Sequence, residues 1–103
     1  MVDGADYQKI VDYYTDKNGK LSYAILNKEM IKFAHSSSVV RNMLAEQEDP
    51  DKIRLYIAGA RFRSITGNHR MTDEEVLKII ELLDEVSPKG IFREFNEEIW
   101  KKM

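Results

Sequence analysis

Basic side chains are concentrated between residues 52 and 70, where they could bind an anionic group. This basic segment contains no acidic residue. Its members are Lys52, Arg54, Arg61, Arg63, His69 and Arg70. The following stretch, residues 71–99, carries nine acidic residues and three basic ones. Charge is therefore polarised along the chain.

Three kinds of chemistry fit the basic segment. Its arginines can pair with the acidic helix that follows, for instance with Glu81 or Asp84, because guanidinium groups suit partly buried ion pairs. They can instead bind an acidic protein or a small anion. They can also contact nucleic-acid phosphates, with strongly salt-dependent affinity. Internal pairing is favoured, since the net charge is −2 and the next helix begins with Asp73-Glu74-Glu75, which suits a DNA groove poorly.

Other candidates for chemistry are weaker. One loop resembles the middle of a calcium site, but Tyr14 and Ile25 stand where the first and twelfth ligands must be carboxylates. The two histidines, His35 and His69, lack the further ligands that a metal site requires. The serines beside His35 are better explained as helix caps than as a nucleophile. The sequence therefore predicts no catalytic residue, no cofactor and no metal ligand.

Aromatic side chains gather near the end of the chain. Phe92 and Phe95 share a helical stripe, with Trp100 on its flank. Aromatic residues and arginine are the types that anchor protein interfaces. Packing in the core is favoured, and docking on a second copy is the alternative. The candidate interaction surface comprises Arg54, Arg61, Arg63, His69, Arg70, Phe92, Phe95 and Trp100.

Length and composition indicate one globular domain, residues 1–103. The chain is 43% hydrophobic and 33% charged, within the ordinary range for such a domain. It has no cysteine, which excludes disulfide scaffolds, zinc knuckles and thiol catalysis. The first residues do not resemble a signal peptide, and no apolar run approaches the ~20 residues that cross a bilayer. We expect a cytoplasmic protein that does not contact membranes.

Hydrophobic periodicity predicts five or six short helices. The most informative spans residues 50–66, with Asp49 as its N-terminal cap and Gly67 at its end. It is apolar on two nearly opposite sides, one including Ile57 and the other Phe62. A helix that is apolar on two sides is packed on two sides. We therefore expect this helix at the centre of a bundle.

The other predicted helices lie on either side of it in the chain. Asn18-Gly19 ends the first, which spans about residues 5–16, although this dipeptide is also a hairpin signal. Ser22 caps the second helix, and serines at 36–38 separate it from a short third one. A capping box at Thr72–Glu75 begins a helix that reaches Val86 and ends at residues 87–90. The last helix carries the aromatic stripe.

These features together predict an all-α bundle that acts as a non-enzymatic protein-interaction or regulatory module. Its partner is another protein or its own copy. The alternative is a nucleic-acid-binding accessory protein that uses residues 52–70. In size and helix order alone, the chain resembles bacteriocin immunity proteins and accessory proteins of phages and mobile elements. A shared fold would not imply a shared function.

Overall fold

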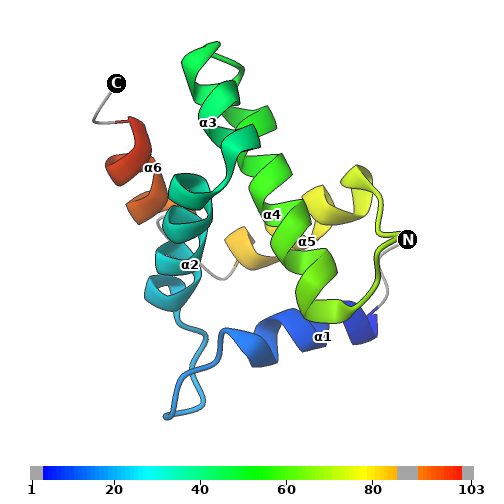
Figure 1. Ribbon diagram of the computed structural model, residues 1–103. Coiled ribbons are helices and arrows are strands. Elements are labelled where there is room, and N and C mark those ends of the chain that lie inside the picture. The colour runs from blue at the N-terminus through cyan, green and yellow to red at the C-terminus, as the bar shows by residue number, and fades with distance from the viewer. Residues whose placement is uncertain (1–3, 86–90, 101–103) are drawn as a thin grey trace.

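The computed structural model describes residues 4–85 and 91–100 and shows six α-helices joined by short connections (Figure 1). In chain order they are α1 (Gly4–Tyr13), α2 (Tyr23–Ser36), α3 (Ser38–Ala45), α4 (Pro50–Thr66), α5 (Asp73–Glu85) and α6 (Arg93–Trp100). No β-strand forms among these residues, whose one extended pairing is an isolated bridge between Thr15 and Leu21. The predicted all-α bundle of five to six helices is confirmed.

Helix α4 has the predicted bounds and the predicted central position. The Asp49 carboxylate accepts a hydrogen bond from the backbone N–H of Asp51 at 2.9 Å, and Pro50 begins the helix. Gly67 ends it with a φ of 74°, a left-handed conformation that glycine adopts without strain. The helix packs against α1, α2, α3 and α5 and runs through the middle of the bundle (Figure 1).

The core receives side chains from every helix. Ile57 and Phe62 project from different sides of α4, and both are fully buried. The fully buried side chains of the other elements include Ile10, Tyr14, Leu26, Met30, Val40, Val76, Ile79, Leu83, Ile91 and Phe95. Helix α4 is therefore packed on two sides, as its two apolar faces predict.

The first helix ends earlier than the sequence pattern predicts. It stops at Tyr13 rather than near residue 16. The Asp16 carboxylate accepts a hydrogen bond from the backbone N–H of Asn18 at 2.8 Å, and such local bonds compete with helical ones. Gly19 follows with a φ of 77°. The hairpin signal thus forms a tight turn closed by the isolated bridge, with no strand on either side in the described chain.

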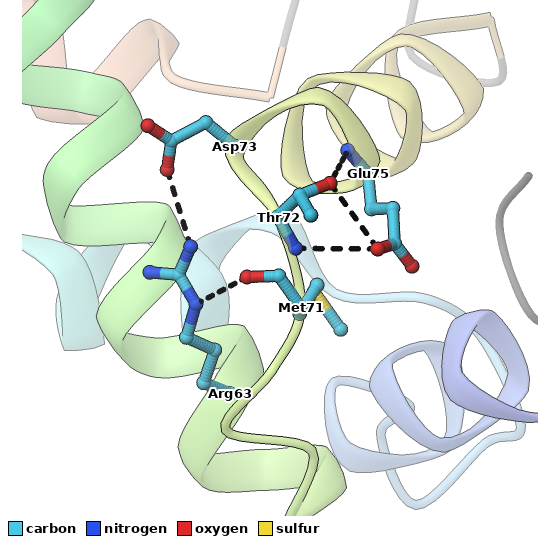
Figure 2. Close-up of polar contacts among 5 residues, drawn as sticks. All are labelled: Arg63, Met71, Thr72, Asp73 and Glu75. Carbon is cyan, nitrogen blue, oxygen red and sulfur yellow. Dashed lines mark hydrogen bonds and ion pairs between the residues drawn. The ribbon is translucent and has the colours of Figure 1, made fainter.

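Side-chain caps fix two further boundaries as predicted. The Ser37 N–H donates to the carbonyl of Phe33 at 2.9 Å, and its Oγ accepts the N–H of Val40 at 3.3 Å. It therefore ends α2 and begins α3. Thr72 and Glu75 each accept a hydrogen bond from the other's backbone N–H, both at 3.2 Å, and form the predicted capping box (Figure 2). Residues 86–90, where this helix was expected to end, lie outside the described residues.

Helix α6 is held against α2 by a buried asparagine. The Asn27 side chain is 1% exposed, and its Nδ2 donates to the carbonyls of Tyr23 and Ile91, both at 2.7 Å. Its Oδ1 accepts the backbone N–H of Phe95 at 2.8 Å. That N–H belongs to the first turn of α6, whose donors lack partners within the helix. One side chain therefore fixes both α6 and Ile91, which lies two residues before the helix.

Candidate functional site

Arg54, the first arginine of the predicted interaction surface, lies between α4 and α6. Its guanidinium pairs with Asp51 one turn earlier and donates to Oδ1 of Asn96 at 3.0 Å. The guanidinium carbon also lies 5.9 Å from the centre of the Trp100 ring, within cation–π range. The Trp100 indole N–H donates to the same Asn96 oxygen at 3.1 Å. The structure thus brings together two of the predicted surface residues, Arg54 and Trp100.

Arg63 connects the end of α4 to the start of α5. Its Nε donates to the carbonyl of Met71 at 2.8 Å, and its Nη2 lies 3.1 Å from the Asp73 carboxylate (Figure 2). Its guanidinium also lies over Gly59, where an added Cβ would be 2.7 Å from Nη1. This arginine therefore holds the α4–α5 connection in place.

The sequence predicts that the arginines pair with the following helix, for instance with Glu81 or Asp84. This prediction is only partly confirmed. Arg63 does contact α5, but at Asp73, the first residue of the helix. The carboxylate of Glu81 lies 3.8 Å from Lys78 instead. The carboxylate of Asp84 accepts the backbone N–H of Ile91 at 2.9 Å. Both predicted partners thus contact groups other than the arginines.

The other predicted surface residues do not form one patch. His69 and Arg70 are exposed in the α4–α5 connection. Phe92 and Phe95 are buried, Phe95 completely, and their rings meet edge to face at 5.9 Å. These two rings belong to the core, which corrects their placement on the candidate surface. The predicted surface residues are therefore divided among several parts of the bundle.

A different set of side chains surrounds an open groove of about 470 Å³ along α2. One border is a stripe of α2, the other is α4, and the residue that ends α1 lies at its margin. The groove is lined by Tyr13, Ile25, Lys28, Glu29, Lys32, Phe33, Ser36 and Arg61. We call this set the α2–α4 groove. The α2 members recur every three or four residues and therefore share one face of the helix.

The α2–α4 groove is cationic. Lys28 and Lys32 are exposed one turn apart on α2, and Arg61 faces them from α4. The one carboxylate among the lining residues belongs to Glu29, which already pairs with Arg61. The two lysines therefore give the groove an excess of positive charge.

The groove also presents apolar surface to solvent. Tyr13 is 49% exposed and Ile25 is 41% exposed, although both are large apolar side chains. Phe33 lines the groove farther along α2, and its ring lies 6.4 Å from that of Tyr56, which is itself exposed. Exposed apolar side chains gathered in one place mark interaction surfaces, whereas scattered ones do not.

Glu29 joins the wall of the groove to the core. Its Oε1 accepts the Nε–H of Arg61 and, at 3.3 Å, the hydroxyl of the buried Tyr14. Burial, and after it the charge of Glu29, raise the pKa of the Tyr14 phenol well above its ordinary value. Burial alone would lower the pKa of the Arg61 guanidinium, but the hydrogen bond and charge of Glu29 outweigh it and raise that pKa. At neutral pH the cluster therefore consists of the neutral phenol of Tyr14, the carboxylate of Glu29 and the guanidinium cation of Arg61.

A second groove, of about 410 Å³, lies where α4, α5 and the start of α6 meet. Its apolar lining includes Leu55, Leu77 and Ile80. Its charged lining residues are Asp51, Arg54, Asp84 and Arg93. Two acidic and two basic groups leave this groove without a net charge, so it offers no electrostatic preference for a partner.

Sequence reasoning found one member of the α2–α4 groove, Arg61, and missed the rest. Lys28 and Lys32 fall in a helix whose basic residues do not stand out against the rest of the chain. The available signal was their spacing of four residues with Ile25 and Phe33 on either side, which puts apolar and basic groups on one helix face. No property of that face alone shows that α4 brings Arg61 to it.

No protein-family model matches the sequence, and neither a curated protein nor a solved structure shows detectable similarity to it. Within the described residues, no group of three or more histidine, cysteine, aspartate or glutamate side chains is placed to hold a metal ion. No helix in the same part of the chain has the length and apolar character to cross a membrane.

Proposed function

We propose that this protein is a non-enzymatic interaction module that binds an acidic, partly apolar segment of a protein partner in the α2–α4 groove. The observation that carries the proposal is the meeting of Lys28, Lys32 and Arg61 with Ile25 and Phe33 in one open groove. Cations favour a carboxylate-bearing ligand, and exposed apolar groups favour one that also has apolar side chains.

The state of Glu29 supports binding rather than catalysis. A general acid or base must exchange a proton with a ligand, so its side chain has to reach the reacting atoms. One oxygen of Glu29 already accepts from both Arg61 and Tyr14. The phenol of Tyr14 is fully buried. These contacts hold Glu29 as part of the groove wall, which favours a binding role.

The shape of the groove supports a helical ligand. The lining face of α2 extends from Ile25 to Ser36, which at 1.5 Å per residue is about 16 Å, or three helical turns. Amphipathic helices bind such grooves through side chains spaced three or four residues apart. A partner helix with one or two apolar residues among several carboxylates would meet both the lysines and the apolar lining.

A protein ligand fits better than a nucleic acid. The chain carries a net charge of −2, and nucleic-acid binding depends on neutralising several phosphates. Three of the four arginines of the basic segment, which would supply most of those contacts, are instead engaged by Asp51, Glu29 and Asp73. Two lysines that form no ion pair within residues 4–85 and 91–100, set in a short groove, match a few carboxylates rather than a phosphate backbone.

Titration of isotope-labelled protein, followed by amide NMR, tests the proposal with three probes. These are a synthetic helical peptide of leucine and glutamate, the same peptide with lysine for glutamate, and a single-stranded oligonucleotide. We expect the acidic peptide to shift the amide signals of α2 around Lys28 and Lys32. Lys28→Glu/Lys32→Glu should weaken binding about tenfold or more, since like charges then face each other.

Lys9→Glu/Lys52→Glu is the matched control. It makes the same change in net charge at two exposed lysines outside the groove lining and should leave binding within about twofold of wild type, because exposed charges at a distance are screened. Equal binding of both peptides, or shifts away from α2, would overturn the proposal. Oligonucleotide binding that depends on Lys28 and Lys32, without peptide binding, would replace it with a nucleic-acid function.

A further inference from the structure

We infer that the segment that occupies the α2–α4 groove is α5 of a second copy of this chain. The inference rests on the proposed function and names its partner. Its basis is that α5 presents to solvent the kind of surface the groove is suited to bind. That surface is an acidic helix face with an exposed leucine in it, three turns long.

The outer face of α5 carries this surface. Glu74, Leu77, Glu81 and Glu85 are all exposed and follow one another at spacings of three or four, so they form one stripe along the helix. Leu77 is 46% exposed despite its size. We call these four residues the α5 stripe. Lys78, four residues after Glu74 and three before Glu81, is exposed on the same face, with its Nζ 3.8 Å from the Glu81 carboxylate. Three carboxylates and one ammonium group leave this face with a net charge of −2.

Other acidic residues of α5 are excluded from the stripe because they have partners within their own copy. Asp73 pairs with Arg63, and Asp84 accepts the N–H of Ile91. Glu75 closes the capping box with Thr72. Within the part of the chain that the structure describes, Glu74 and Glu85, with the loosely paired Glu81, therefore remain as the carboxylates that can face a second molecule.

The α5 stripe and the α2–α4 groove match in length and in chemistry. From Glu74 to Glu85 the stripe covers 12 residues, or 11 helical steps, and the lining face of α2 covers the same number from Ile25 to Ser36. Each is about 16 Å long at 1.5 Å per residue. Carboxylates would meet the lysines and Leu77 would meet the apolar lining, which is complementarity in both charge and polarity.

The stripe cannot reach the groove of its own molecule. Helix α5 is fixed by Val76, Ile79 and Leu83, all fully buried in the core. The exposed Glu74, Glu81 and Glu85 therefore lie on its far side, and Leu77 lies at the margin of the second groove. Figure 1 shows α5 crossing α4 behind it in that view, whereas α2 lies beside α4. The α5 stripe of one copy therefore meets the α2–α4 groove of another copy, so the two copies contribute different surfaces. Such head-to-tail contacts form rings or open chains.

Sedimentation equilibrium over a range of concentrations tests the inference by charge reversal and restoration. Wild type should self-associate, less strongly as salt screens the charges. Lys28→Glu/Lys32→Glu and Glu74→Lys/Glu81→Lys should each weaken self-association about tenfold or more. The variant with all four changes has the wild-type net charge and opposite charges at both surfaces, so it should regain association.

Two further variants separate charge complementarity from simpler effects. Leu77→Ser should weaken association with no change in charge, because it removes the apolar contact. An equimolar mixture of the two double variants should associate. A mixture of Lys9→Glu/Lys52→Glu with Glu46→Lys/Glu94→Lys, which carries the same net charges at positions outside groove and stripe, should show no gain over wild type. Circular dichroism confirms that each variant is folded.

The outcomes distinguish this inference from the proposed function. A wild-type protein that stays monomeric at the highest concentrations, or a fourfold variant that does not regain association, overturns the inference. If the acidic peptide still binds at Lys28 and Lys32, the groove keeps its function with a different partner. If neither the peptide nor a second copy binds, both proposals fail.

Discussion

Glu29 of α2 and Arg61 of α4 form an ion pair between the two helices that border the groove, with 19% and 26% of their side chains exposed. The same carboxylate oxygen also accepts the hydroxyl of Tyr14, the residue that follows α1. Three segments of the bundle thus meet at one atom. The pair therefore sets the position of the α2 stripe, and with it that of Lys28 and Lys32.

Removing the charge of Glu29 should destabilise the protein. In Glu29→Gln the Arg61 guanidinium keeps a polar neighbour but loses its counter-ion in a mostly buried position. We expect a loss of about 2 kcal/mol in the free energy of unfolding, measured by urea denaturation. Glu97→Gln, which breaks an exposed pair with Arg93 at 3.5 Å, should cost less than about 0.5 kcal/mol. Equal losses in both variants would show that Glu29 and Arg61 make only a surface pair.

The buried Tyr14 should make the free energy of unfolding fall as the pH rises above 10. Burial, and after it Glu29, raise the pKa of its phenol above the ordinary value of 10.0. A raised folded-state pKa contributes stability that is complete below pH 10 and is lost as pH rises toward that folded-state pKa, since only the unfolded chain then releases the proton. The loss is about 1.4 kcal/mol per pH unit. Tyr14→Phe should flatten the unfolding free energy measured above pH 10, whereas Tyr13→Phe, at an exposed ring, should not.

The substitution Gly59→Ala should have opposite effects on the free energy of unfolding with and without the Arg63 side chain. Alanine in a helix is favoured over glycine by about 1 kcal/mol, but a Cβ at Gly59 would lie 2.7 Å from Arg63 Nη1. The guanidinium would then have to leave the Met71 carbonyl, a charge-assisted bond worth about 2 kcal/mol. Gly59→Ala should thus destabilise wild type by about 1 kcal/mol.

The same substitution should stabilise Arg63→Ala by about 0.5–1 kcal/mol, because the obstructing side chain is gone. Val76 would not oppose it, since its Cγ2 lies 3.7 Å from the added Cβ, an ordinary contact. A double-mutant cycle measured by thermal or urea unfolding gives both values. Effects of the same sign in the two backgrounds would contradict the proposed contact.

Asn27→Leu should release α6 from the bundle. Leucine has a similar volume but cannot replace the bonds to the Ile91 carbonyl and the Phe95 N–H, which would be left buried without partners. We expect a loss of about 3 kcal/mol, with faster hydrogen exchange in α6 than in α4. Fluorescence of Trp100, the single tryptophan, should follow the release. Asn42→Leu, at an exposed position of α3, should change neither observable appreciably.

Much of the helical framework could be predicted from the sequence. Asp49, Gly67 and the Thr72–Glu75 capping box mark boundaries that the structure confirms, because a cap is formed by side chains within a few residues of the backbone group they bind. Alternation of apolar and polar residues likewise identified the two buried sides of α4. The early end of α1 was missed, because the Asp16 side chain captures backbone donors that a periodicity pattern does not register.

The partners of the charged residues and the site itself were decided only by the tertiary structure. Arg61 and Glu29 are 32 residues apart, and Asn27 and Phe95 are 68 apart, so their meeting depends on how whole helices pack. The α2–α4 groove exists because those two helices leave an open space beside their contact, and the spacing of Lys28 and Lys32 does not contain that information. Residues close together in the chain determine where each helix begins and ends and which side is buried. The positions of the helices relative to one another depend on packing between residues that are far apart in the chain.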